Sequence, residues 1–491
     1  MSGGRSSPAD ELAGGVSLDA LFRANAAGRA VSIALIDPAN RTSFTDGAPR
    51  RLTYAETDAE VERLARRLRS FALPPGSVVA VQLPNIVESV LSLLAILRAG
   101  LVAAPVPMLW RRLDLVSALA RVEPKALITL ARREDESPAE IACEAAAELF
   151  SLSFPCAFGE NVPDGVISLG QEDGAAEAPS APFAPAPASA VTIVTFDAAP
   201  KGFFAVARDD AQWLAAGLAV LLEAKIASGD TIVTTLPANS LAGIGGAIVP
   251  WLLSGGTLEL VQGASPALIA AAGQASRSHL LAPAAILPEL TRHLPARFVS
   301  CIAVHRGRAS TRDFASVPCD RVVDLFAFGE IGAVALQRED RREPSPIPLG
   351  PISAPVGAIG APVVVETHLD GGEVLLRGPM VPRLAVDADG FVTSGYRCRS
   401  DGNGAFVVKA GPERVVSVGG LRFGLDDLRA RLATCGGGVT AIVVDDPLLG
   451  QRLRIAADDP PAAAAAMEAA GHSRLVIDAL VQHTDKRRAA G

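Results

Sequence analysis

Short apolar runs of the kind that form β-strands alternate with helical patterns through much of the first 130 residues. The strand-like runs lie at 78–83, 101–106 and 126–130. Helical patterns lie between them at 86–98 and 113–121, and the connections are only a few residues long. Nearly continuous apolar strands joined through helices are typical of parallel sheets that are covered on both faces. The sequence therefore predicts an α/β fold with doubly wound sheets.

The alternation returns in the second half of the chain and then changes character. Strand-like runs at 231–236 and 257–261 flank a helical pattern at 244–253. From about residue 373 the strands become shorter and are separated by Gly and Asp-Gly turns. Such turns favour a small antiparallel, β-rich piece, which we expect to be followed by a separate C-terminal lobe.

We predict two domains from this change of pattern. Residues 1–410 are expected to form the large N-terminal domain, and residues 411–491 a smaller, mobile α+β domain. Within the first domain, residues 174–190 are rich in Pro and Ala and predict an extended, exposed linker.

Composition excludes several classes of protein. The net charge is −8 and no long basic block is present, which argues against nucleic acid as a partner. The six cysteines are far apart with no Cys-x-x-Cys pair, so a zinc site or disulfide framework is not expected. Residues 1–10 are polar and lack an apolar signal core. These features predict a cytoplasmic protein.

One uncharged segment, between Asp230 and Glu259, leaves two interpretations open. It is long enough for a membrane span, since about 20 apolar residues suffice. It also contains two prolines and several glycines, and its pattern is that of strand, turn, helix, turn and strand. We therefore expect a buried interior helix and no transmembrane segment.

The stretch from Thr192 to Gly202 is the candidate phosphate-binding segment. An apolar β-type run ends here in small residues followed by Pro-Lys-Gly. A strand that opens into a loop of backbone N–H groups beside a lysine often holds a polyphosphate. The expected loop is poor for this task, because it offers one glycine and the hydroxyl of Thr195, while Asp197 would repel phosphate.

Several stretches in colinear order together resemble one enzyme superfamily. They include Leu52-Thr53-Tyr54, Val78 to Asn85, Leu97 to Val102, Leu236 to Gly243, Gly255 to Leu258, Phe326-Ala327-Phe328-Gly329-Glu330, Asp389 to Gly395 and Val418 to Leu428. The chain is similar to the adenylate-forming superfamily, which comprises acyl-CoA synthetases, nonribosomal-peptide adenylation domains and luciferases. The match covers most of the chain.

The resemblance implies a two-step reaction. A carboxylic acid attacks the α-phosphate of Mg-ATP to give an acyl-adenylate, and a thiol of coenzyme A or a carrier protein then displaces AMP. Such chemistry needs positioning and charge neutralisation more than a protein nucleophile. The C-terminal domain is expected to rotate between the two steps.

The resemblance also assigns catalytic and metal-binding roles. Lys201 would lie over the β- and γ-phosphates, Lys486 would polarise the carboxylate and the α-phosphate, and Glu330 would coordinate Mg²⁺. Ordinary alternatives stay open for each. Lys201 could be an exposed turn lysine, Lys486 part of a solvated basic tail, and Glu330 a carboxylate at the start of a helix.

Further residues are expected to bind the cofactors. Thr195 and Gly202 belong to the phosphate segment, and Tyr396 stands where the family has the aspartate that binds both ribose hydroxyls. Gly419 and Gly420 resemble the loop that lines the thiol tunnel, or are simply a turn.

Two functional hypotheses follow. The first is an AMP-forming acyl or aryl acid ligase that uses ATP, Mg²⁺ and coenzyme A. The second is a catalytically impaired homologue that binds an acyl, CoA or protein ligand on the same scaffold.

Arg306 and Arg308 replace a glycine-rich turn beside the expected pocket, where they could bind an anion or face water.

Overall fold

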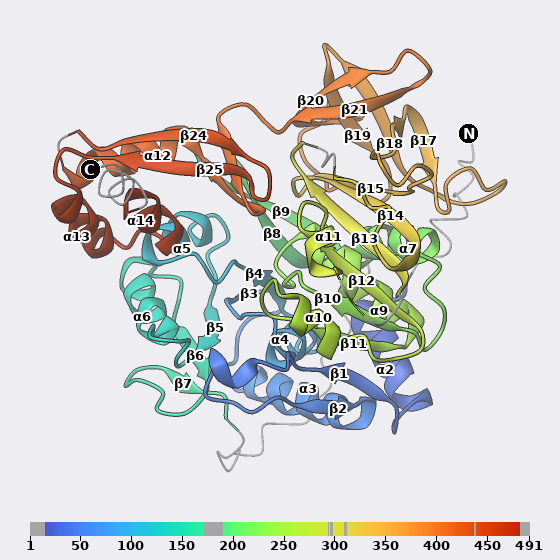
Figure 1. The fold of residues 1–491 in the computed structure, drawn as a ribbon. Coiled ribbons are helices and arrows are strands. Elements are labelled where there is room, and N and C mark those ends of the chain that lie inside the picture. The colour runs from blue at the N-terminus through green and yellow to red at the C-terminus, as the bar shows by residue number, and fades with distance from the viewer. Residues whose placement is uncertain are drawn as a thin grey trace, which may run out of the picture.

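The computed structural model describes residues 15–170, 190–292, 294, 298–308, 312–436 and 438–481. In this part of the chain the strands form four sheets (Figure 1). Two of them are large and mainly parallel, one is antiparallel, and the last belongs to the C-terminal lobe. The mixed α/β architecture with a smaller C-terminal lobe is as predicted. The linker predicted at 174–190 lies almost entirely outside the described residues.

The first parallel sheet has the strand order β7-β6-β5-β3-β4-β8-β9. All neighbours are parallel except the last pair, β8 and β9. Because β4 and β5 lie on opposite sides of β3, the sheet is doubly wound. The strand bounds are β3 Val78–Val81, β4 Val102–Pro105, β5 Ala126–Leu130, β6 Phe154–Phe158, β7 Ile167–Ser168, β8 Val191–Ala199 and β9 Gly202–Asp209.

The second parallel sheet has the order β15-β14-β13-β12-β10-β11-β1-β2, with antiparallel strands only at its two edges. It lies beside the first sheet and shares its largest apolar core with it. The strand bounds are β1 Ile33–Ile36, β2 Arg51–Thr53, β10 Thr231–Thr234, β11 Thr257–Leu260, β12 Ser278–Pro283, β13 Phe298–Arg306, β14 Cys319–Phe328 and β15 Gly332–Gln337.

Helices of the N-terminal domain cover the sheets where the apolar patterns predict them. Helix α3 begins with a capping box, in which the side chains of Thr53 and Glu56 accept hydrogen bonds from each other's backbone N–H groups. Asn85 is of a type that often caps helices but does not cap α4: its side chain donates to the carbonyls of Thr234 on β10 and of Val261, which follows β11. The helices are α2 Leu18–Gly28, α3 Tyr54–Arg69, α4 Val87–Arg98, α5 Arg112–Leu119, α6 Pro138–Glu148, α7 Asp210–Glu223, α10 Pro266–Ala271 and α11 Leu287–Leu290.

The uncharged segment after Asp230 is an interior helix, as expected. It contains α8 (Leu241–Gly243), a π-helical turn (Ile244–Ile248) and α9 (Val249–Ser254), which follow one another directly. Gly217 of α7 lets the segment approach closely, since a Cβ there would overlap the side chain of Val249. Among the described residues, no helix has both the length and the apolar character that a membrane crossing requires.

The antiparallel sheet has the order β16-β21-β20-β19-β18-β17 and follows the parallel sheets in the chain. Its last strand ends at Ala410, and the next strand, β22, begins at Val415 in the C-terminal lobe. The domain boundary predicted at 410/411 falls in this gap and stays a prediction. The strands are β16 Ile347–Pro348, β17 Gly350–Ser353, β18 Val363–Asp370, β19 Glu373–Arg377, β20 Val392–Ser400 and β21 Ala405–Ala410.

The C-terminal lobe has an antiparallel sheet, β23-β22-β25-β24, and an apolar core of its own. In Figure 1 it lies above α5 and the β8–β9 pair. Its elements are β22 Val415–Val418, β23 Leu421–Gly424, α12 Leu425–Leu432, β24 Thr440–Asp446, β25 Gly450–Ala456, α13 Pro460–Ala470 and α14 Arg474–Val481.

Candidate functional site

The segment expected to be a phosphate-binding loop is a tight β-hairpin. Strands β8 and β9 pair antiparallel until Ala199 lies opposite Gly202, which leaves only Pro200 and Lys201 in the turn. Hydrogen bonding between the two strands therefore replaces the open loop of free N–H groups, so the expected loop is wrong. The sequence favours the hairpin because the apolar run continues on both sides of a two-residue Pro-Lys turn. Gly202 closes the turn with φ +131°, a conformation that suits glycine.

An ion pair at this hairpin joins the two lobes. Asp197 on β8 accepts a hydrogen bond from the guanidinium of Arg422 on β23, and both side chains are almost wholly buried. The other Asp197 oxygen, Oδ2, accepts the backbone N–H of Glu330 at 2.8 Å. Asp197, read in the sequence as a residue that repels phosphate, is thus the partner of an arginine 225 residues away.

Glu330 lies in the turn between β14 and β15 and points its carboxylate at the start of α8. Its Oε2 accepts the backbone N–H of Leu241 at 2.6 Å. Burial, opposed by Arg306 and Arg208, raises the pKa of Glu330 to about 7. At neutral pH this group therefore exists in both its ionised and its neutral form.

Arg208 holds the backbone around Glu330 in place. This fully buried side chain on β9 donates to the carbonyls of Glu330 at 2.5 Å, Ile331 at 3.0 Å and Met380 at 3.2 Å. Burial lowers the pKa of Arg208 to about 10, which leaves it charged at neutral pH. The arginine thus ties the β14–β15 turn to the segment that follows the antiparallel strand β19.

Arg306, at the end of β13, links the N-terminal domain to the C-terminal lobe at the site. Its guanidinium donates to the Ser240 hydroxyl and, at 3.3 Å, to the carbonyl of Gly420. Ser240 is the N-cap of α8, and its hydroxyl also accepts the N–H of Gly243. The Gly419–Gly420 turn between β22 and β23 therefore faces the site through Arg306.

Tyr396, on β20, contacts the turn that carries Glu330. Its hydroxyl accepts the N–H of Gly329 at 2.9 Å, and its ring meets Phe328 edge-on at 5.3 Å between centroids. Gly329 has φ +58°, and a Cβ there would overlap both Asp197 and Arg422. Gly329 stands where the family that the chain resembles has a threonine that contacts phosphate, and the ion pair between the lobes fills the space beside it.

The remaining predicted site residues are divided between the site and its periphery. Thr195 is fully buried on β8, and its hydroxyl has no partner among the described residues. Lys201 is exposed at the hairpin tip, four residues beyond Asp197, and Gly202 follows it in the turn. Lys486 lies outside the described residues, so its predicted role stays a prediction.

Main-chain contacts dock the C-terminal lobe on the N-terminal domain. Two N–H groups in the first turn of α12, those of Asp426 and Asp427, both donate to the carbonyl of Pro200 at 3.1 Å. Arg431 on the same helix pairs with Asp114 of α5 at 3.0 Å. A Cβ at Gly424 would overlap the carbonyl oxygens of Ala199 and Pro200, so the two surfaces meet at backbone distance.

The site fits some of the implied cofactors better than others. The carboxylates of Asp197 and Glu330 are oxygen donors of the type that Mg²⁺ prefers, although no cluster of three such ligands occurs within the described ranges. A triphosphate does not fit the docked arrangement. The hairpin offers no glycine loop, Lys201 is exposed at its tip, and Arg422 is already paired with Asp197. The Gly419–Gly420 turn faces the site, but Arg306 lies directly against it.

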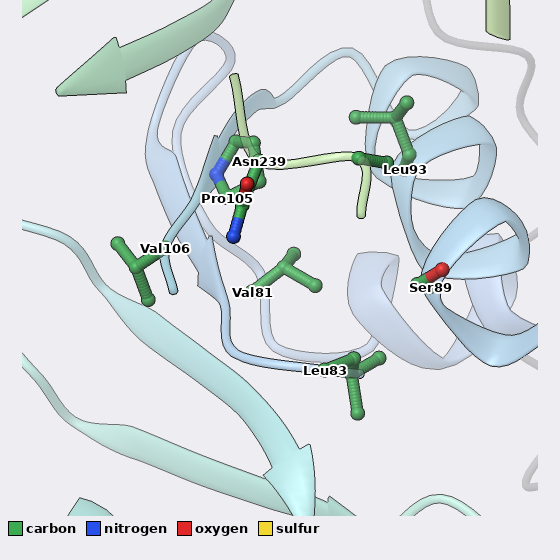
Figure 2. A pocket seen from close by; sticks show the side chains of 8 residues that line it. Val81, Leu83, Ser89, Leu93, Pro105, Val106 and Asn239 are labelled. Carbon is green, nitrogen blue, oxygen red and sulfur yellow. The ribbon is translucent and has the colours of Figure 1, made fainter. Parts of the chain in front are cut away.

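A small hollow is lined in part by Ala238 and Asn239, which come just before Ser240 in the chain (Figure 2). Its volume of about 10 Å³ is room for roughly one water molecule, so it does not hold an organic ligand as it stands. The lining is mostly apolar and comprises Val81, Leu83, Ser89, Leu93, Pro105, Val106, Ala238 and Asn239.

Sequence reasoning missed Arg422 and Arg208, which hold the site together. Both are ordinary arginines in strand-like runs, and the side-chain hydrogen bonds of each reach residues more than 120 positions away. One signal was available: Asp197 in an otherwise apolar strand needs a buried partner.

Comparisons with known proteins agree with the fold. The model of the AMP-binding enzyme family matches residues 22–383. Pseudomonine synthase PmsE of Pseudomonas entomophila is 41% identical over 87 residues, which are 18% of this chain and 14% of that protein. An oxalate–CoA ligase of Arabidopsis thaliana is 34% identical over 123 residues, 25% of this chain and 23% of the ligase. Each match thus spans less than a quarter of the relative's length.

A solved structure extends the likeness over nearly the whole chain. The apo structure of MbtA from Mycobacterium smegmatis superposes with a TM-score of 0.68 at 20% identity, covering 96% of this chain and 92% of MbtA. At this identity the superposition shows a shared fold.

Proposed function

The chain belongs to the family of AMP-binding enzymes, and on that premise we propose that it binds a carboxylic acid between its two lobes without activating it while the lobes are docked. The observation that carries this proposal is the ion pair of Asp197 and Arg422, which fills the space beside Gly329. The family implies an acid as ligand, and the arginines around Glu330 supply the positive charge that an acid needs.

Nucleotide binding is expected to be weak in this arrangement. Three contacts that the resemblance implies are replaced: the phosphate loop by a hairpin, the ribose aspartate by Tyr396, and the phosphate threonine by Gly329. Each lost contact to a buried polar group costs about 1–3 kcal/mol. Together they would weaken ATP binding by several factors of ten, since about 1.4 kcal/mol is a tenfold change.

A second candidate is the AMP-forming acid ligase, with coenzyme A or a carrier-protein thiol as acceptor. It is favoured by the two carboxylates, Asp197 and Glu330, and by the Gly419–Gly420 turn, which come together at one place. ATP would supply the activating group. For it to enter, the C-terminal lobe must undock so that Arg422 leaves Asp197, after which the two carboxylates are free to hold Mg²⁺.

Calorimetric titration separates the two candidates. The full chain is titrated with Mg-ATP up to millimolar concentration, and separately with butyrate, benzoate and succinate. We expect saturable binding of at least one acid and none of Mg-ATP. Acid-dependent ATP–pyrophosphate exchange that is lost in Lys201→Ala, and kept in the exposed-lysine control Lys409→Ala, would instead establish the ligase. If none of the three acids binds, the proposed function is wrong.

A further inference from the structure

Strand β24 leaves the outer edge of the C-terminal sheet open. It stands at the end of the strand order, and among the described residues its backbone makes no main-chain hydrogen bond to any segment other than β25. The opposite edge strand, β23, contacts β8 and β9 of the N-terminal domain. In Figure 1 β24 lies on the side of the lobe that faces away from that domain. Its outer row of N–H and C=O groups is therefore a template for pairing with a further strand.

The other sheet edges are protected in ways that β24 is not. Four of the edge strands, β2, β7, β16 and β17, have only two to four residues. Strand β9 contacts β23, and β15 lies against α7 and β18. By contrast, β24 has seven residues, pairs with β25 without a bulge, and contains neither a charge nor a proline from Thr440 to Val444. Because proteins normally shorten, charge or cover a long edge, we expect another strand to cover this one.

The exposed side chains of β24 suit such a strand. Ile442 is 51% exposed although it is large and apolar, and Val444 on the same face is partly exposed. Val443 points to the other face, where it packs against the C-terminal core but is only partly buried. β-Branched residues stabilise a sheet when they lie opposite one another on neighbouring strands. A partner strand with the same residues would bury all three.

The charges beside the two ends of this edge are complementary. Arg429 on α12 is exposed, and its guanidinium donates to the carbonyl of Ala441 near the start of β24 at 3.4 Å. Asp445, near the end of β24, is exposed as well. In the described part of the chain neither forms an ion pair, whereas the nearby Arg431 and Asp446 both do. Two antiparallel β24 strands would bring the start of one beside the end of the other, and so join these charges.

From this geometry we infer that two copies of the chain pair their β24 strands antiparallel about a two-fold axis at Val443. All seven residues of each strand are then paired. Ile442 lies opposite Val444 of the second copy, and Asp445 of the second copy lies beside Arg429. Each contact occurs twice because the interface is isologous, and the two four-stranded sheets become one of eight strands. Two short strands make a small interface, so the dimer forms reversibly and only at high concentration.

Sedimentation velocity of the full chain tests the association between about 1 and 300 µM, and we expect a dissociation constant of about 1–100 µM. Hydrogen exchange locates the interface: the amides of β24 should be protected at the highest concentration and exchange freely at the lowest. Ile442→Lys, which places a charge on the edge, should weaken association at least tenfold. The control Val31→Lys, at an apolar side chain that is 90% exposed elsewhere, should leave it unchanged.

A charge reversal tests the register. Asp445→Arg and Arg429→Asp each place like charges together and should weaken association about tenfold to a hundredfold, while the double variant should restore it. Thermal unfolding checks that each variant is folded, and Ile442→Lys decides if a charge variant is not. A chain that stays monomeric throughout overturns the inference, as does a dimer that survives both Ile442→Lys and Asp445→Arg. Protection of the β24 amides at the lowest concentration overturns it too, because another part of the same chain then covers the edge.

Discussion

The buried ion pair between Asp197 and Arg422 is expected to hold the C-terminal lobe in its docked orientation. The perturbation is a double-mutant cycle with Asp197→Asn, Arg422→Met and the double variant. Two unit charges about 4 Å apart attract by about 4 kcal/mol at an effective dielectric constant of about 20. The two side chains are only 5% and 11% exposed, so solvent screens this attraction little.

Each single variant should therefore lower the free energy of unfolding by about 3 kcal/mol, since it leaves a buried charge without its partner. The coupling energy should be about 2–3 kcal/mol, because in the Arg422→Met variant Asp197 still accepts the backbone N–H groups of Ala198 and Glu330, which offset part of the lost attraction. Urea unfolding followed by circular dichroism measures all four proteins.

A matched cycle on Asp446 and Arg452 serves as the control. This pair lies within the C-terminal lobe at 2.9 Å, but the arginine is 43% exposed, so its coupling should stay below about 0.5 kcal/mol. If the Asp197–Arg422 coupling is no larger than this control, the pair does not hold the lobes together and the reasoning from burial is wrong.

Two further perturbations test the docking surface and the C-terminal core. Gly424→Ala should separate the lobes, because its Cβ would overlap the carbonyls of Ala199 and Pro200. The overlap should weaken docking of the lobes by about 1–3 kcal/mol, and proteolysis between residues 411 and 415 should become roughly tenfold faster. Gly28→Ala, where a Cβ meets open space, is the control, and equal cleavage rates would contradict the prediction. In the core, burial lowers the pKa of His472 to about 4. Because the unfolded chain then binds the proton more readily, the stability is full above about pH 6.5 and falls by about 3 kcal/mol as the pH drops towards 4. His472→Gln should flatten this slope in urea unfolding and the exposed-histidine control His368→Gln should not; unchanged slopes in both would count against the assignment.

Much of the fold could be predicted because it depends on local patterns. The capping box at Thr53 and Glu56 and the apolar run at 126–130 mark a helix start and a buried strand without reference to the rest of the chain. The uncharged segment after Asp230 was predicted as an interior helix because prolines and glycines interrupt it. Such signals depend only on residues that are close in the sequence, so they do not require knowledge of the tertiary structure.

The candidate site was less predictable because contacts between distant residues decide it. The segment 195–200 was compared with a glycine loop, whereas pairing with β9 makes it a strand, and this pairing depends on residues 202–209. Likewise nothing local distinguishes Arg306 from Arg308; the difference is that Ser240 and Gly420 lie within reach of only one of them. The roles predicted for Lys201, Lys486, Glu330 and Tyr396 stay predictions.

The guanidinium of Arg208 has a consequence for how tightly a small molecule can be held. By binding the carbonyls of Glu330, Ile331 and Met380, it fixes the backbone of the site when the chain folds. A visiting molecule then has no need to organise that surface, and the ordering entropy that usually weakens association is avoided there. Movement on binding should be confined to the C-terminal lobe, while the backbone that Arg208 holds keeps its position.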